Sequence, residues 1–67
     1  MENNIAYYRN QAGLTQKQLA EKFNISQGII ASIERGTKSP SIRSLKMMSE
    51  FFGVSIDELL KNELAQK

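Results

Sequence analysis

The side chains available for chemistry in this 67-residue chain are amides, hydroxyls, carboxylates, lysines and arginines, because the sequence contains no histidine and no cysteine. Ser–His and Cys–His nucleophile pairs are therefore impossible. The carboxylates are scattered, and Asp57 with Glu58 is explained by the favourable field at a helix N-terminus. None of the four glycines belongs to a phosphate-cradling loop. We therefore expect no enzyme, no cofactor and no bound metal ion.

The polar residues with the most informative spacing lie in residues 15–36, TQKQLAEKFNISQGIIASIERG. If the part after Ser26 is helical, Ile30 and Ile33 face inward. The outward positions are then those of Gln27, Gly28, Ala31 and Ser32. A Gln amide can bond bidentately to adenine, Ser can donate or accept, and Ala can meet a thymine methyl group. Such a small, polar face suits recognition in a groove, not catalysis.

Two short helices joined by a tight turn would hold this face in place. Thr15 and Gln18 form a capping-box pattern, in which a hydroxyl and an amide satisfy free N–H groups of a first helical turn. Asn24 tolerates the left-handed backbone of a tight corner. Ser26 is a good N-cap for the next helix, and Gly36 ends it. The sequence therefore predicts a helix-turn-helix over about residues 15–35.

Three further helices are expected around this unit. Residues 2–12 form the first, with Asn3 or Asn4 as its cap. Residues 41–53 form another after a turn that contains Pro40, and a Ser55–Glu58 capping box opens the last, beyond which residues 62–67 fray. The inward-facing residues expected on these helices are Ile5, Tyr8, Ala12, Ile42, Leu45, Met48, Phe52, Ile56, Leu59 and Leu60. The fold class is all-α, with five short helices in one compact domain of residues 1–67.

Three segments resemble the Cro and phage-repressor type of helix-turn-helix, the XRE family: RNQAGLTQKQLAEKFNIS, SIERG and SPSIRSLKMMSEFFGVSIDELL. They cover residues 5–60, nearly the whole chain. The resemblance implies a lambda-repressor-like fold and a transcriptional regulator with double-stranded DNA as its partner. It also implies that Gln27 reads a base, as a Gln at the matching position does in lambdoid phage repressors, and that Arg9 forms a structural ion pair with Glu34.

The resemblance further implies where the DNA backbone is bound. Gln16 would contact a phosphate at a helix N-terminus and brace the base-reading Gln27. The full set of expected backbone contacts is Gln16, Lys17, Arg35, Thr37, Lys38, Ser39 and Arg43. Gly28, Ala31 and Ser32 depart from the family, which often places larger polar residues at these positions. We therefore expect few direct base hydrogen bonds, with some specificity left to DNA shape.

Charge is distributed unevenly along the chain, although the net charge is only +2. Residues 1–46 carry seven basic and three acidic side chains, a balance of +4, whereas residues 47–67 carry two basic and four acidic ones, a balance of −2. The basic part contains the helix-turn-helix, as a footprint for phosphates requires. Counts alone leave ordinary solvated charges as an alternative. Absence of cysteine fits a reducing cytoplasm, and no apolar run is long enough to span a membrane.

Met47 and Phe51 form a second apolar pair, one turn apart and beside the expected core stripe. They either widen the core contact or mark an interface. One monomer covers few base pairs, so we expect a homodimer on a palindromic operator, with half-sites about 10–10.5 bp apart. The candidate dimer-interface residues are Met47, Phe51, Ile56, Leu60 and Leu64.

Two alternatives differ from a DNA-binding regulator. A protein-interaction module, such as an antitoxin, would use the apolar surface of Met47 and Phe51 and would tolerate substitution of Lys38 and Arg43. A metabolic enzyme is disfavoured by the missing nucleophile–base chemistry. No small-molecule ligand is predicted from so short a chain.

Overall fold

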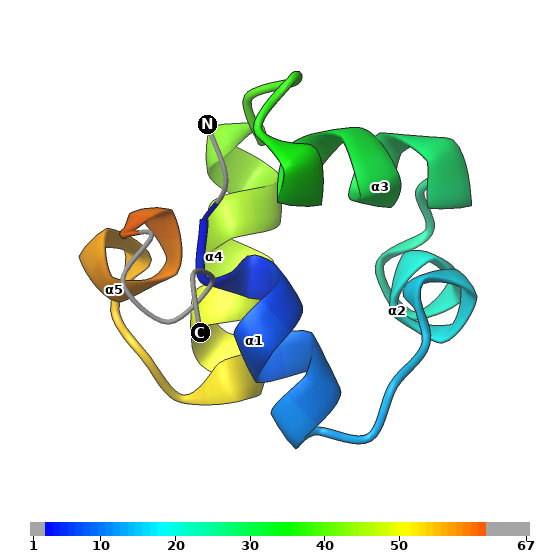
Figure 1. Cartoon of the computed structure of the whole chain (residues 1–67). Helices are drawn as coiled ribbons and strands as arrows, with labels where there is room; N and C mark the ends of the chain where they lie inside the picture. The colour runs from blue at the N-terminus through cyan, green and yellow to red at the C-terminus, as the bar shows by residue number, and fades with distance from the viewer. Residues whose placement is uncertain (1–2, 62–67) are drawn as a thin grey trace.

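The computed structural model describes residues 3–61, and within that range the chain forms five α-helices and no strand. The helices are α1 (Ile5–Gln11), α2 (Gln16–Phe23), α3 (Gln27–Arg35), α4 (Ile42–Phe52) and α5 (Ile56–Leu60). In Figure 1, α3 runs across the top of the molecule, with α2 at the right and α5 at the left. The packing of α2 against α3 and of α4 against α5 confirms the all-α expectation and divides the fold into two pairs.

Each of the last four helices begins at a hydroxyl residue, as the sequence predicts. The side-chain oxygens of Thr15, Ser26, Ser41 and Ser55 each accept a hydrogen bond from the backbone N–H three residues later. At Thr15 the reciprocal bond is also present, so the predicted capping box with Gln18 is complete. A cap of this kind stabilises a helix by about 1 kcal/mol. These local signals therefore determine where the helices start.

One hydrophobic core joins the five helices. Its fully buried side chains come from every helix: Ile5, Leu19, Ile30, Ile33, Met48 and Leu59. Burying an aliphatic side chain of this size contributes about 1.5–3 kcal/mol. The described residues contain neither a cysteine nor a cluster of metal-ligating side chains, so within that range neither a disulfide nor a metal site reinforces this core.

The first helix is shorter than predicted. It begins at Ile5 and ends at Gln11, and Ala12 is exposed instead of facing the core. Asn4 occupies the N-cap position without a side-chain cap bond, and its Nδ2 donates to the Glu58 carbonyl at 2.8 Å. Asn3 has the capping role instead, since its Oδ1 accepts from the Ile5 N–H at 3.1 Å.

Besides Ala12, two further residues expected in the core are exposed. Ile42 is 75% exposed and Leu60 is 47% exposed. At about 100° per residue, Ile42 lies about 120° around α4 from the buried Met48, so its spacing places it at the edge of the stripe. Leu60 directly follows the fully buried Leu59, and neighbouring helical positions point in different directions. The expectation that both face inward was wrong.

The capping box predicted at Ser55 is half formed. Ser55 Oγ accepts from the Glu58 N–H at 3.1 Å, but the Glu58 carboxylate accepts from the Tyr8 hydroxyl at 3.4 Å and lies 3.6 Å from Lys61 Nζ. Burial raises the pKa of Tyr8, and the neighbouring Glu58 carboxylate raises it further. Glu58 therefore links α5 to α1 instead of closing its own helix. The predicted fraying of residues 62–67 lies outside the described residues.

Candidate nucleic-acid interface

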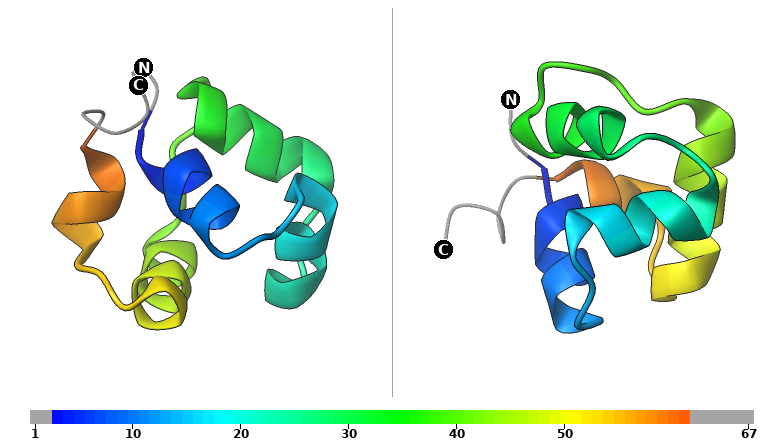
Figure 2. Two further views of the ribbon diagram at one scale, coloured as in Figure 1. Left: turned by 60° about the horizontal axis from the view of Figure 1, so that its bottom comes forward. Right: turned by 90° about the vertical axis from the view of Figure 1, so that its right-hand side faces the viewer.

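The outer face of α3 is not covered by any other described helix (Figures 1 and 2). Ile30 and Ile33 are buried in the core, and Ile29 packs against it while partly exposed. On the other side, Gln27 and Gly28 are exposed and Ala31 and Ser32 are half-buried. The four residues predicted to read bases therefore lie on or at the margin of the uncovered face.

The turn between α2 and α3 fixes the position of this face. Asn24 adopts the left-handed conformation, with φ 57° and ψ 44°, as the sequence predicts. The Ile25 N–H then donates to the Ala20 carbonyl at 3.0 Å, and Phe23 and Ile25 pack against the core from either side of the corner. Backbone hydrogen bonds and apolar contacts therefore both hold the turn in place.

The loop after α3 protrudes on the same side as the uncovered face (Figure 1). Thr37 closes the end of α3, since its N–H and its hydroxyl both donate to the Ser32 carbonyl, at 3.0 Å and 3.2 Å. A phosphate oxygen can only accept, and the Thr37 hydroxyl hydrogen is already used. The exposed Lys38 and Ser39 are therefore the better phosphate donors in this loop.

Four basic side chains around α3 are exposed: Lys17, Arg35, Lys38 and Arg43. Within residues 3–61 the salt bridges are Arg9–Glu34 and Lys61–Glu58, so none of the four is neutralised by a described carboxylate. Free surface cations of this kind are available to bind phosphates.

Arg9 and Glu34 form the ion pair that the resemblance implies. Arg9 Nε lies 2.7 Å from Glu34 Oε2, and Arg9 also donates to the Leu14 carbonyl at 2.8 Å. Both side chains are largely buried, with 14% of the Arg9 side chain and 7% of the Glu34 side chain exposed. A buried carboxylate needs such a partner, so this pair connects α1 to α3.

The structure adds a third member that the sequence did not reveal. Gln16 Nε2 donates to Glu34 Oε1 at 3.0 Å, and no hydrogen bond joins Gln16 to Gln27 within the described range. The contact between Gln16 and Gln27 that the resemblance implies is thus absent from the free protein. Gln16 is hydrogen-bonded to Glu34 instead. The only sequence signal was that Arg9, Gln16 and Glu34 all lie in segments that resemble the family.

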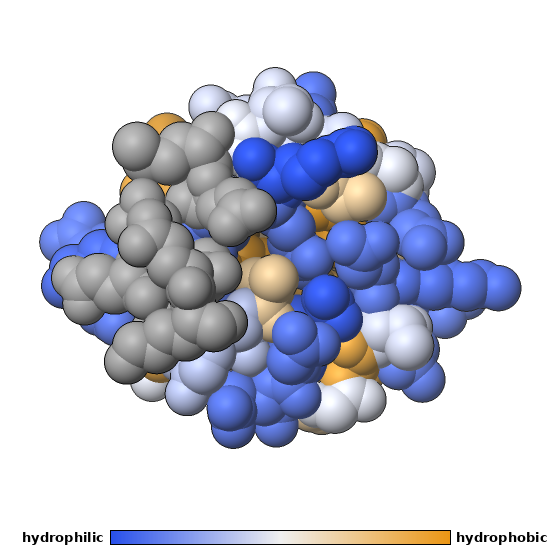
Figure 3. Space-filling model, in the orientation of Figure 1, coloured by the Kyte–Doolittle hydropathy of each residue, from blue (hydrophilic) through white to orange (hydrophobic). Residues whose placement is uncertain are grey.

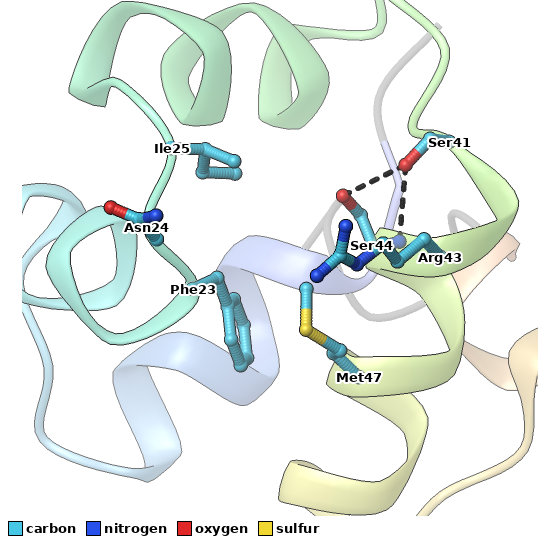
Figure 4. Close-up of a pocket in the computed structure, with 7 residues that line it drawn as sticks. All are labelled: Phe23, Asn24, Ile25, Ser41, Arg43, Ser44 and Met47. Atoms are coloured by element: carbon cyan, nitrogen blue, oxygen red, sulfur yellow. Dashed lines mark hydrogen bonds between the residues drawn. The ribbon is translucent and has the colours of Figure 1, made fainter.

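A shallow pocket of about 200 Å³ lies between the turn and α4 (Figure 4). Phe23, Ile25 and Met47 contribute apolar surface, and Arg43 is its charged member. Ser41 and Ser44 are occupied with each other and with the cap of α4, as the dashed lines in Figure 4 show. Met47 is half-buried and lines this pocket together with Phe23 and Ile25 of the corner.

Phe51, the other half of the apolar pair, is 40% exposed. Its ring meets that of Phe23 edge to face, with centroids 5.7 Å apart, and Lys22 Nζ lies 5.3 Å from its centroid. Phe51 packs on α2, as a wider core contact requires, and still leaves apolar surface exposed, as an interface requires. Both alternatives for the Met47–Phe51 pair thus retain support. Of the other dimer candidates, Leu60 is exposed, Ile56 packs against the core and Leu64 lies outside the described residues.

The surface seen in Figure 3 is largely hydrophilic, with apolar atoms confined to small patches between polar side chains. Within the described residues, no group of three or more His, Cys, Asp or Glu residues could hold a metal ion. No described helix has the length and apolar character needed to cross a bilayer. The groups that the described surface offers around α3 are polar and basic side chains suited to binding.

A helix-turn-helix whose second helix has a free polar face, with basic residues on either side, defines a class of DNA-binding domain. A sequence model described as helix-turn-helix matches residues 5–59. The chain belongs to this family, the XRE type of DNA-binding transcriptional regulators.

Its relatives include proteins of archaea, bacteria and a phage. An uncharacterized HTH-type transcriptional regulator of Methanocaldococcus jannaschii is 39% identical over 88% of this chain and 89% of its own length. The HTH-type transcriptional activator BcrR of Enterococcus faecalis is 47% identical over 82% of this chain and 27% of its own. The immunity repressor protein of Bacillus phage phi105 is 36% identical over 88% and 41%. No solved structure gave a significant match.

These relatives include a transcriptional activator and a repressor, and they differ in length. The chain spans nearly all of the archaeal relative but less than half of BcrR and of the phage repressor. The named relatives are transcriptional regulators and not enzymes.

Proposed function

We propose that this chain is a sequence-specific, double-stranded DNA-binding regulator that represses transcription as a homodimer on a palindromic operator. The observation that carries the proposal is the uncovered face of α3, with the exposed Gln27 at its start. In helix-turn-helix proteins the N-terminal residues of the second helix contact base edges in the major groove. A regulator of this kind works in the cytoplasm.

Base recognition would be concentrated on Gln27, whose amide can bond to N6 and N7 of adenine. Ser32 and Ala31 would make smaller contacts, and Gly28 would allow close approach without a side chain. Because three of these four side chains are small, part of the specificity would come from the shape and deformability of the DNA.

Backbone binding would come from the free cations and from the start of α2. Lys17, Arg35, Lys38 and Arg43 are exposed and unpaired among the described residues. Each phosphate contact releases counterions, so the affinity should fall steeply with salt. Gln16 and Ser39 would add hydrogen bonds, while Thr37 would contribute mainly by ordering the loop.

Dimerisation is supported by apolar side chains left exposed on α4 and α5. Phe51 is 40% exposed and Leu60 47% exposed, and both belong to the predicted interface set. Ile42, which is 75% exposed, is an additional candidate that its apolar spacing had predicted to lie in the core. A two-fold axis would relate two copies of α3 and set half-sites about 10–10.5 bp apart.

The same exposed Phe51 supports a second candidate function, a module that acts mainly through a protein partner such as a toxin. In that case the apolar surface of Met47 and Phe51 would be the working surface. Substitution of Lys38 and Arg43 would then leave function unchanged.

Selection from a library of randomised duplexes tests the proposal and identifies the operator in the same experiment. We expect a palindrome with half-sites about one helical turn apart and a complex that contains two protein chains by sedimentation. Recovery of no preferred sequence would contradict the DNA-binding proposal. Recovery of a single half-site bound by one chain would contradict only the dimer.

A further inference from the structure

We propose that Glu34 is a positioning residue for DNA binding, because it orients the amide of Gln16 and, together with Arg9, fixes the start of α2 relative to α3. This inference rests on the proposed function. It assigns to the buried ion pair a role beyond joining α1 to α3.

The orientation follows from the chemistry of the two groups. A surface amide has two orientations related by a half turn, which exchange its oxygen and its nitrogen. A carboxylate accepts hydrogen bonds and cannot donate them, so Glu34 selects the orientation in which Gln16 Nε2 points toward it. The observed Nε2–Oε1 distance of 3.0 Å agrees with that selection.

The selected orientation leaves particular groups for DNA. Nε2 keeps a second N–H that can donate to a phosphate, which only accepts. Oε1 of Gln16 remains free to accept from a donor such as the amide of Gln27. An unrestrained Gln16 would present the wrong atom for part of the time and would lose more side-chain entropy on binding.

Arg9 fixes Glu34 and the start of α2 at once. Its Nε and Nη2 donate to the two carboxylate oxygens, at 2.7 Å and 3.3 Å, while its Nη1 donates to the Leu14 carbonyl at 2.8 Å. Leu14 directly precedes Thr15, the cap of α2. One guanidinium therefore contacts both the recognition helix and the backbone that leads into the expected phosphate site.

A purely structural ion pair would need only its two charged members. The third member, Gln16, is half-buried at the first position of α2 and is one of the residues expected to bind the DNA backbone. The network therefore determines the spacing between a phosphate contact on α2 and a base contact on α3. A displacement of either helix would break that register.

The test is a double-mutant cycle on the affinity for the selected operator, with Gln16→Ala, Glu34→Gln and the double variant. We expect Gln16→Ala to weaken binding about tenfold in the wild-type background and less than about twofold in the Glu34→Gln background. Asp57→Asn, on α5, is the matched control because it removes the same charge. Gln16→Ala should keep its full effect in the Asp57→Asn background.

Equal effects of Gln16→Ala in all three backgrounds would overturn the inference while leaving the proposed function intact. Failure of the wild-type protein to prefer any duplex would overturn both.

If Glu34→Gln does not fold, the NMR signals of the Gln16 side-chain amide test the inference in the wild-type protein, both free and in complex with operator. We expect one Gln16 N–H to be shifted downfield in the free protein and the second to shift on binding, with the exposed Gln27 amide as the free-state reference. A free-protein Gln16 amide that resembles Gln27 would overturn the inference.

Discussion

The pair α2–α3 and the pair α4–α5 are each associated with one salt bridge, and the two bridges differ in burial and distance. Arg9–Glu34, which holds α3, has an N–O distance of 2.7 Å and side chains 14% and 7% exposed. Lys61–Glu58, at the end of α5, has a distance of 3.6 Å and side chains 51% and 34% exposed. Only the first can fix geometry, because an exposed pair is solvated and contributes little.

The two regions also differ in what they leave on the surface. The α2–α3 unit exposes an amide, small residues and free cations, and its isoleucines face the core. The α4–α5 pair leaves Ile42, Phe51 and Leu60 partly or largely exposed. The first surface suits a polar, charged partner, whereas the second suits an apolar one.

The largest expected effect separates the two salt bridges. Arg9→Met leaves the Glu34 carboxylate buried and unpaired, so the free energy of unfolding should fall by about 3–5 kcal/mol. Lys61→Met should change it by less than about 0.5 kcal/mol. Urea denaturation followed by circular dichroism measures both. Equal losses in the two variants would remove the distinction between the regions.

The next effect concerns base recognition by α3. Gln27→Ala should cost about 1–3 kcal/mol in affinity for the operator because it removes a bidentate contact. Its affinity for random duplex should stay unchanged, since the phosphate contacts remain. Fluorescence anisotropy with both duplexes measures the two terms. A parallel loss on both would assign Gln27 to the backbone or to the fold.

The exposed apolar residues are tested by the strength of dimerisation. Leu60→Ser should weaken the dimer by about 1 kcal/mol per protomer, because roughly half of the side chain is still free to be buried. Its monomer stability should change little. Ile42→Ser is the comparison, and sedimentation equilibrium is the measurement. If Ile42→Ser alone weakens the dimer, the interface lies at the start of α4 and the predicted set is wrong.

The free cations are tested by salt dependence. Lys38→Ala should weaken binding to all sequences alike and reduce the slope of log K against log salt by about 0.9, the value for one phosphate contact. Lys61→Ala, on the other helix pair, should leave the slope unchanged. A change of slope in both variants would mean that general charge, and not the site, carries the effect.

The smallest expected effect is a gain in stability. Gly28 lies inside α3, and a Cβ there would meet no atom within 4 Å. Gly28→Ala should therefore stabilise the free protein by about 0.5–1 kcal/mol. Gly53→Ala should destabilise it, because Gly53 has a φ of 70°. If Gly28→Ala leaves operator affinity unchanged, Gly28 does not approach the groove closely.

Local signals in the sequence predicted much of the fold. The capping hydroxyls, the left-handed Asn24 and the apolar spacing of Ile30 and Ile33 each act within a few residues, so they appear directly in the chain. Spacing alone places Ile42 and Leu60 away from the most buried residue of each helix, but it does not say how far burial extends around the helix. The width of the buried sector depends on how each helix packs against its neighbours.

The site was predicted less completely than the fold. The outward positions on α3 follow from helical periodicity, whereas the Gln16–Glu34 hydrogen bond joins residues 18 positions apart. The buried hydrogen bond from Asn3 Nδ2 to the Ile33 carbonyl, at 2.7 Å, likewise joins residues that are far apart in the sequence. Contacts of this kind depend on the placement of whole helices, which no local pattern encodes.

The most direct measurement of the central claim compares wild-type affinity for the selected operator and for random duplex across a salt titration. The proposed regulator should prefer the operator by about a thousandfold or more, with a steep negative salt slope on both duplexes. Equal and weak binding to the two duplexes would contradict it. The exposed surface around Phe51, and not α3, would then be the working face of the protein.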